Sequence, residues 1–238
     1  MHEQLLSRYL QSLTAGRRTE CFEIIREALV SGVAPESVVM DVVWSAMAHV
    51  DKLFKADRIN AAIESIACRI NRTVADQIQP YLPRKEASGK RIIVCCAESQ
   101  VEEIGAQMVS DLFQADGWDV TFVGGEIPDD EMLALISALR PDVLLVFGTQ
   151  PQGVPRVRQL IDMVREIDAC PTMNVVVSGG VFNRADGLWQ EVGADIFASS
   201  AKNVLRLVNE LRPRELNAPR NSVVKKRRRK RKTAVASA

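Results

Sequence analysis

The chain has 238 residues, enough for two small domains that each bury a hydrophobic core. Hydrophobic residues make up 47% of it and charged residues 26%, and every apolar run is shorter than the roughly 18 residues that suggest a membrane span. The N-terminus lacks the pattern of a secretory signal, and the net charge of +1 conceals a basic run near the C-terminus, so we expect a cytoplasmic protein that is net acidic elsewhere.

Apolar residues at spacings of three and four predict helices throughout the first third of the chain. Short connections between such helices favour antiparallel neighbours in a bundle. We therefore expect residues 1–82 to form an all-α helical bundle, followed by a polar, turn-forming linker at 83–89. The expected helices cover 2–13, 19–31, 36–54 and 59–81.

From residue 90 the pattern changes to short apolar strands that alternate with amphipathic helices, which is typical of a parallel sheet covered on both faces. We expect a flavodoxin-like, doubly wound α/β domain over 90–212, with a five-stranded parallel sheet in the order 2-1-3-4-5. In that fold, ligands bind at the carboxyl ends of the strands. The expected strands are 91–97, 119–123, 143–147, 174–178 and 196–198, and the expected helices lie near 101–116, 129–139, 155–168, 184–192 and 201–211.

The last segment, 213–238, is polar and then strongly basic, with too little apolar content to offset the entropy of ordering it. We expect it to be disordered. Eight consecutive cations gain free energy chiefly by releasing counterions from a polyanion, which predicts non-specific contact with nucleic acid. These residues are Lys225, Lys226, Arg227, Arg228, Arg229, Lys230, Arg231 and Lys232.

Three loops that follow strands have a distinctive layout. The first runs from Glu98 to Gly105, the second is Gly148-Thr149-Gln150-Pro151, and the third is Ser178-Gly179-Gly180. This layout resembles the cobalamin-binding domain of corrinoid methyltransferases, mutases and light-sensing regulators, whose motifs are Asp-x-His-x-x-Gly, Ser-x-Leu and Gly-Gly. The resemblance covers nearly all of residues 1–211. It implies that cobalamin, or a related planar tetrapyrrole, binds between the bundle and the sheet.

The first loop departs from the family motif. Alignment on Gly105 places Gln100 at the aspartate and Glu102 at the histidine that ligates cobalt, so neither member of that pair is present. In the second loop Thr149 keeps the hydroxyl while Pro151 replaces leucine, and in the third loop the Gly-Gly pair matches fully. The resemblance implies a cofactor site that includes Glu102, Gly105, Thr149, Gly179 and Gly180.

The bundle resembles the partner domain that caps the corrin. In the photoreceptor branch this cap carries a Trp and, ten residues later, a Glu-His pair, and here Phe54, Glu64 and Ser65 hold those positions. The two histidines of the chain, His2 and His49, fall at neither motif. The resemblance therefore implies contacts from Phe54 and Glu64 to a cobalamin that keeps its own base, water or an adenosyl group as axial ligands.

Each of these residues also has a structural interpretation. The three glycines suit the turns and close packing of any flavodoxin-like domain. Adjacent acids such as Glu102 and Glu103 are more often charges favoured by a helix dipole than an acid–base pair, and Thr149 can cap a strand end. The five cysteines are odd in number and lack a Cys-x-x-Cys pair, which argues against disulfides and a thiolate metal site. Cys95 and Cys96 are expected on opposite faces of the first strand.

Two functions follow from these observations. The first is a cobalamin-binding sensor or regulator that holds the corrin without a protein histidine and acts on a protein partner. The second is a cofactor-free interaction scaffold tethered to nucleic acid by the basic tail. A methyl-carrying corrinoid protein is the enzymatic alternative, disfavoured because Glu102 replaces the histidine. The chain has no P-loop and only two histidines, so we do not expect an enzyme.

Overall fold

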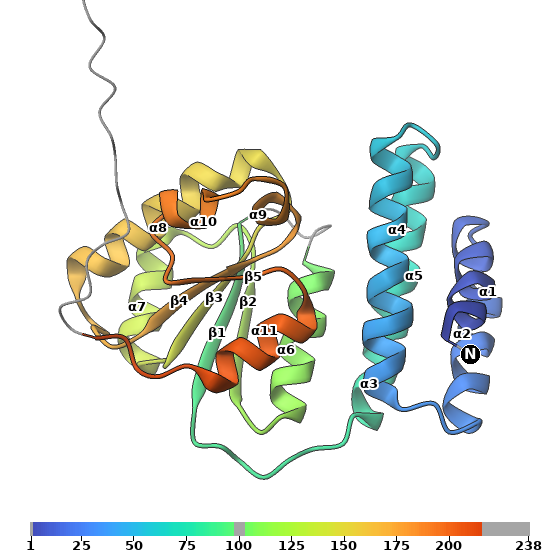
Figure 1. The fold of residues 1–238 in the computed structure, drawn as a ribbon, viewed down its shortest axis with the longest axis horizontal. Helices are drawn as coiled ribbons and strands as arrows, with labels where there is room; N and C mark the ends of the chain where they lie inside the picture. The colour runs from blue at the N-terminus through green and yellow to red at the C-terminus, as the bar shows by residue number, and fades with distance from the viewer. Residues whose placement is uncertain (1, 98–102, 216–238) are drawn as a thin grey trace, which may run out of the picture.

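The computed structural model describes residues 2–97 and 103–215. Figure 1 shows a set of helices at the N-terminal end beside a parallel sheet with helices on both faces. Glu102 and the basic residues 225–232 lie outside the described residues, so their predicted roles stay predictions. Within the described part of the chain, no helix is long and apolar enough to cross a membrane.

The N-terminal half is helical, as predicted. The helix that starts at Ala61 is capped by Asn60, whose side chain accepts a hydrogen bond from the backbone N–H of Ile63 at 3.0 Å. The helix expected over 36–54 is interrupted by a π-helical segment that turns four valines into the core. The elements are α1 (His2–Thr14), α2 (Arg18–Val30), α3 (Pro35–Ser37), the π-helical segment (Val38–Val43), α4 (Trp44–Lys55), α5 (Ala61–Ile78) and a 3-10 turn (Gln79–Tyr81).

The sheet has five parallel strands in the order β2-β1-β3-β4-β5, which confirms the predicted topology. The two strands β3 and β4 are buried along their whole length. Cys95 and Cys96 belong to different apolar clusters on the two faces of the sheet, as their alternation predicted. The strands are β1 (Arg91–Cys96), β2 (Asp119–Gly124), β3 (Val143–Phe147), β4 (Asn174–Ser178) and β5 (Ile196–Ala198).

Different helices cover the two faces of the sheet. α6 (Ile104–Ala115) and α11 (Ala201–Glu210) share an apolar cluster with the bundle, whereas α7 (Asp129–Leu139) and α8 (Val154–Ile167) cover the other face. The helix predicted near 184–192 is wrong: two short helices stand there, α9 (Gly180–Arg184) and α10 (Leu188–Glu191). The backbone of Gly187 between them has a φ of 77°, a left-handed conformation that a continuous helix cannot contain.

The bundle packs against α6 through a mixed seam. One apolar cluster runs from the bundle through α6 to the sheet. The bundle and the α/β domain, the two halves of the molecule, therefore share a core. Along its edge, Gln107 donates a hydrogen bond to Asp76 at 2.5 Å, and Gln79 donates one to Gln114 at 3.3 Å. The face of α5 that contains Asp76, together with Gln79 of the 3-10 turn after it, therefore lies along α6.

Candidate functional site

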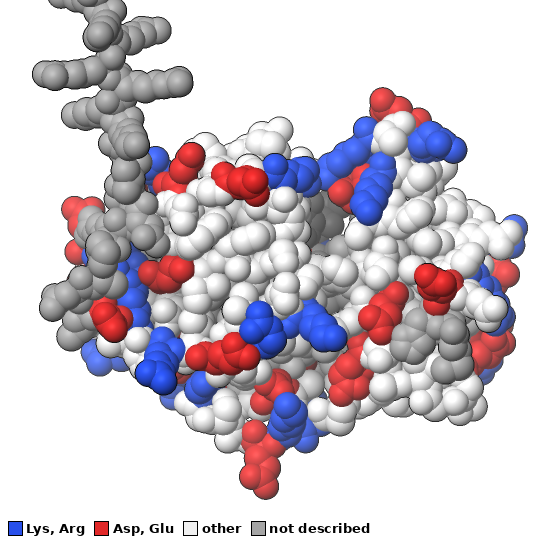
Figure 2. Space-filling view, in the orientation of Figure 1, with Lys and Arg blue, Asp and Glu red and all other residues white. Residues whose placement is uncertain are grey.

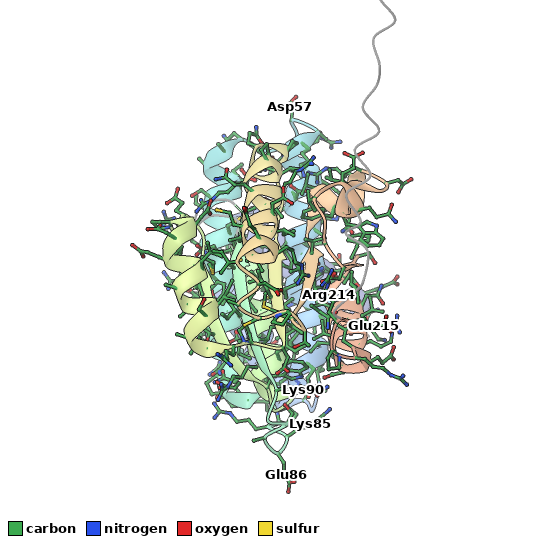
Figure 3. The ribbon with its side chains drawn as sticks, turned by 90° about the vertical axis from the view of Figure 1, so that its left-hand side faces the viewer. Asp57, Lys85, Glu86, Lys90, Arg214 and Glu215 are labelled. Atoms are coloured by element: carbon green, nitrogen blue, oxygen red, sulfur yellow. The ribbon has the colours of Figure 1, made fainter. Side chains whose placement is uncertain are left out.

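The strand order reverses between β1 and β3, and in doubly wound sheets ligands bind outside the carboxyl ends of the strands at such a point. In Figure 1, α4 and α5 run past these strand ends and form a wall beside them. Figure 2 shows the molecular surface indented between the two halves at this end, with Lys and Arg side chains on both sides of the indentation. The candidate site is this recess.

An aromatic pair joins the two halves beside Gly105. The ring of Trp44, from the start of α4, meets the ring of Phe147, at the end of β3, edge to face with centroids 6.1 Å apart. A Cβ added to Gly105 would lie 3.0 Å from the Phe147 ring and 3.7 Å from Trp44. Glycine is therefore the residue that lets α6 begin directly under this pair.

Glu103 is a buried carboxylate at the start of α6. It is 9% exposed, and its Oε1 accepts a hydrogen bond from the backbone N–H of Gly125 at 2.7 Å. Its Oε2 lies 4.0 Å from Nη1 of Arg72 on α5. Glu103 therefore lies at the N-terminus of α6, where the helix dipole favours a carboxylate. Its side chain also links this helix start to the residue after β2 and to the bundle.

The second and third loops meet through their backbones. Gly179 has a φ of 105°, and a Cβ added to it would lie 2.2 Å from the carbonyl oxygen of Gly148. Over Gly180, in contrast, the nearest atom is the guanidinium Nη1 of Arg184, 2.8 Å from an added Cβ. The Nη2 of Arg184 donates a hydrogen bond to the carbonyl oxygen of Thr149 at 2.6 Å. The two glycines thus differ: one allows backbones to touch, and the other faces a movable side chain.

The predicted bundle residues lie farther along the bundle helices. Phe54 and Glu64 are both half-buried. Phe54 follows Trp44 by ten residues and Glu64 precedes Arg72 by eight, so they lie about 15 Å and about 12 Å farther along their helices. The structure therefore brings Gly105, Thr149, Gly179 and Gly180 to the strand ends and sets Phe54 and Glu64 above them on the bundle.

No described histidine side chain reaches the strand-end glycines. His49 is exposed and follows Trp44 by five residues, about 140° round the helix from the face that meets Phe147. Among the residues that the structure describes, no group of three or more His, Cys, Asp and Glu side chains is arranged to hold a metal ion.

Burial shifts two ionisable groups near the sheet. Desolvation raises the pKa of the Cys95 thiol to about 12, although Arg156 opposes this, so the thiol stays protonated at neutral pH. Desolvation, followed by the nearby charge of Asp76, raises the pKa of Asp111 to about 6. Asp111 lies on α6 and Asp76 on α5, so this shift occurs in the seam between the halves.

Comparison with known proteins agrees with this architecture. The sequence profile described as B12 binding domain matches residues 90–209, and a second profile with the same description matches residues 5–79. Dimethylamine corrinoid protein 1 of Methanosarcina acetivorans is 22% identical over 192 residues, which are 79% of this chain and 82% of that protein. Trimethylamine corrinoid protein 2 of the same organism is 19% identical over 209 residues, which are 87% of this chain and 95% of that protein.

A solved structure has the same fold. The monomethylamine corrinoid protein of Methanosarcina barkeri superposes with a TM-score of 0.78 at 16% identity, over 87% of this chain and 98% of that one. The resemblance inferred from the three loops is thereby confirmed. The chain belongs to the B12-binding domain family, and a corrinoid is the cofactor that this membership assigns to it.

Proposed function

We propose that this chain is a sensor or regulator that holds a corrinoid in the recess without a protein histidine on cobalt. Its bound state would favour one placement of the bundle relative to the sheet. The observation that carries this proposal is the position of Trp44, a bundle side chain that packs on Phe147 over Gly105. A flat ligand entering over Gly105 must move a residue of the bundle. A ligand shifts such an equilibrium only through different affinities for the two placements.

The residues around the recess fit a large planar ligand. Side-chain ends, not backbone, cover Gly105 and Gly180, namely the rings of Phe147 and Trp44 and the guanidinium of Arg184. Turning such groups aside costs less than moving backbone. We propose that Glu102, Gly105, Thr149, Gly179 and Gly180 hold the cofactor from the sheet side, and Phe54 and Glu64 from the bundle side. Within this set Gly179 acts by keeping two loops together.

The same residues do not fit ligation of cobalt by histidine. Glu102 takes the position of that histidine in the family motif, and the exposed His49 lies on another side of its helix. The site is therefore suited to a cobalamin that keeps its own base. Such a cofactor supplies a cobalt centre that can carry an aqua, methyl or adenosyl group. The names of the relatives, dimethylamine and trimethylamine corrinoid proteins, support corrinoid binding and make methyl carriage the enzymatic alternative.

An absorption spectrum tests the binding step. The purified protein is incubated in the dark with hydroxo-, methyl- or adenosylcobalamin and then desalted. We expect about one corrin retained per chain, with a spectrum in which the cofactor's own base remains on cobalt. Gly180→Trp should abolish retention, while Gln190→Trp on the exposed side of α10 should not. A colourless wild-type protein with all three cobalamins contradicts the proposal.

Small-angle X-ray scattering tests the regulatory step. If the corrin shifts the bundle, scattering curves with and without bound cobalamin should differ, and Trp44→Ala should reduce the difference. Identical scattering curves with fully bound cofactor would contradict the sensor role and leave only the corrinoid-binding role.

A second function is a cofactor-free scaffold tethered to nucleic acid by the basic tail. The eight consecutive cations at 225–232 support this alternative, because such a run gains free energy by releasing counterions from a polyanion. Gel shifts of DNA and RNA with the full chain and with a variant lacking residues 221–238 test it. Loss of binding on truncation supports the tail's role, and equal binding by the truncated chain contradicts it.

A further inference from the structure

Arg184 stands at the meeting point of two loops of the recess. It ends α9, four residues after Gly180, and its side chain is exposed. One terminal nitrogen lies over Gly180, and the other donates to the carbonyl oxygen of Thr149 at 2.6 Å. The guanidinium therefore spans the second and third loops on the side from which a ligand would enter.

The charge of Arg184 is not neutralised by a carboxylate within residues 2–97 and 103–215. Several other arginines of the α/β half do pair with carboxylates, among them Arg156 with Asp129, Arg158 with Asp162, and Arg165 with Asp195. Arg184 instead donates a hydrogen bond to a neutral carbonyl from one of the five N–H groups of its exposed guanidinium. A cation placed in this way at the rim of a binding recess is ready to accept an anion.

Cobalamins have one fixed anionic group in their periphery. The side chains of the corrin ring are neutral amides, whereas the loop that carries the lower base contains a phosphodiester. A planar guanidinium matches the geometry of phosphate oxygens and can donate two parallel hydrogen bonds to them. Arg184 ends α9 and contacts the loop after β3, so it lies next to the strand-end loops that would hold the lower face of a corrin bound between bundle and sheet.

We infer that Arg184 is a specificity-determining residue that binds the phosphodiester of the nucleotide loop and thereby selects complete cobalamins over corrinoids that lack this loop. The inference rests on the proposed function, since it requires a corrin in the recess. It adds a source of affinity that partly replaces the missing bond between histidine and cobalt.

Two ligands and three variants test the inference. Affinities for cyanocobalamin and for cyanocobinamide, which lacks the nucleotide loop, are measured by quenching of tryptophan fluorescence. The variants are Arg184→Gln, Arg184→Lys and the matched control Arg158→Gln, an exposed arginine of α8 paired with Asp162. Thermal unfolding of each variant checks that the fold is retained.

Arg184→Gln should weaken cyanocobalamin binding about ten-fold and leave cyanocobinamide within about two-fold. Arg184→Lys should fall between wild type and Arg184→Gln, because it keeps the charge and loses the paired donors. The wild-type affinity for cyanocobalamin should also fall with added salt more steeply than that of Arg184→Gln. Arg158→Gln should change neither affinity.

Other outcomes overturn the inference. An equal loss of affinity for both ligands would mean that Arg184 contacts the corrin ring or only holds the loops. Tighter binding of both ligands by the variant would mean that Arg184 blocks access to Gly180. If the wild type binds both ligands and Arg184→Gln changes neither, the inference fails while the proposed function stands. If the wild type binds neither ligand, the proposed function fails and the inference fails with it.

Discussion

Gly179 and Gly180 are adjacent and match the same motif, yet the structure predicts opposite consequences for their replacement by alanine. Gly179 has φ 105° and ψ 170°, a region essentially restricted to glycine, which costs any other residue about 1–3 kcal/mol. Its added Cβ would also lie 2.2 Å from the Gly148 carbonyl oxygen, and relieving such a clash costs about 1–3 kcal/mol more. Gly179→Ala should therefore lower the free energy of unfolding by about 2–6 kcal/mol.

Gly180→Ala should be nearly neutral for folding. Its Cβ meets only the end of the flexible Arg184 side chain, and alanine is favoured over glycine in a helix by up to about 1 kcal/mol. Urea unfolding of both variants, followed by circular dichroism, measures the difference. If Gly179→Ala is as stable as wild type, or if Gly180→Ala loses as much, the distinction between a backbone contact and a ligand-facing glycine is wrong.

Three further changes test the seam between the halves. Glu103→Gln should lower the free energy of unfolding by about 1–3 kcal/mol, because the N–H of Gly125 loses a charged acceptor. Urea unfolding identical to that of the wild type would show that the carboxylate does not stabilise the fold. Protonated Asp111 contributes stability that is fully present below its unfolded pKa near 3.8 and is lost as the pH rises through about 6. Asp111→Asn should therefore be more stable than wild type at pH 7, with a gain that shrinks toward pH 4; melting curves across this range with a constant gain would contradict the raised pKa. Trp44→Ala should cost about 2 kcal/mol, since a half-buried ring leaves the contact with Phe147, and an unchanged thermal midpoint would exclude that contact.

The sheet could be predicted closely from the sequence. The strands at 143–147, 174–178 and 196–198 were predicted with the bounds that the structure shows. Runs of buried β-branched and aliphatic residues bounded by turn residues have few other solutions. The helix expected near 184–192 failed because its apolar spacing continued through Gly187, and the cost of a left-handed residue there depends on how the loop returns to β5.

The roles of the site residues were harder to predict from the sequence than the sheet was. The motif identified both Gly179 and Gly180, but only their φ angles and neighbours separate a fold residue from a ligand-facing one. Glu103 looked like an ordinary helix-start charge, because its partner Arg72 lies 31 positions earlier, on a helix whose rotation toward α6 is set by tertiary packing. Arg184 belongs to no motif, and its importance follows from which loop its side chain reaches.

The loss of the histidine changes what retention of a corrin must depend on. A ligand bond to cobalt would tie the cofactor to the loop after β1 alone, whereas here the proposed contacts come from Arg184 and the strand-end loops on one side and from the bundle on the other. Because the two sets of proposed contacts belong to halves that meet at Trp44, the proposed function links affinity for the corrin to placement of the bundle. Linkage is reciprocal, so a partner that binds one placement of the bundle must change corrin affinity by the same factor as the corrin changes affinity for the partner. A site without the histidine thus suits a regulator better than a site in which one metal bond dominates the binding free energy.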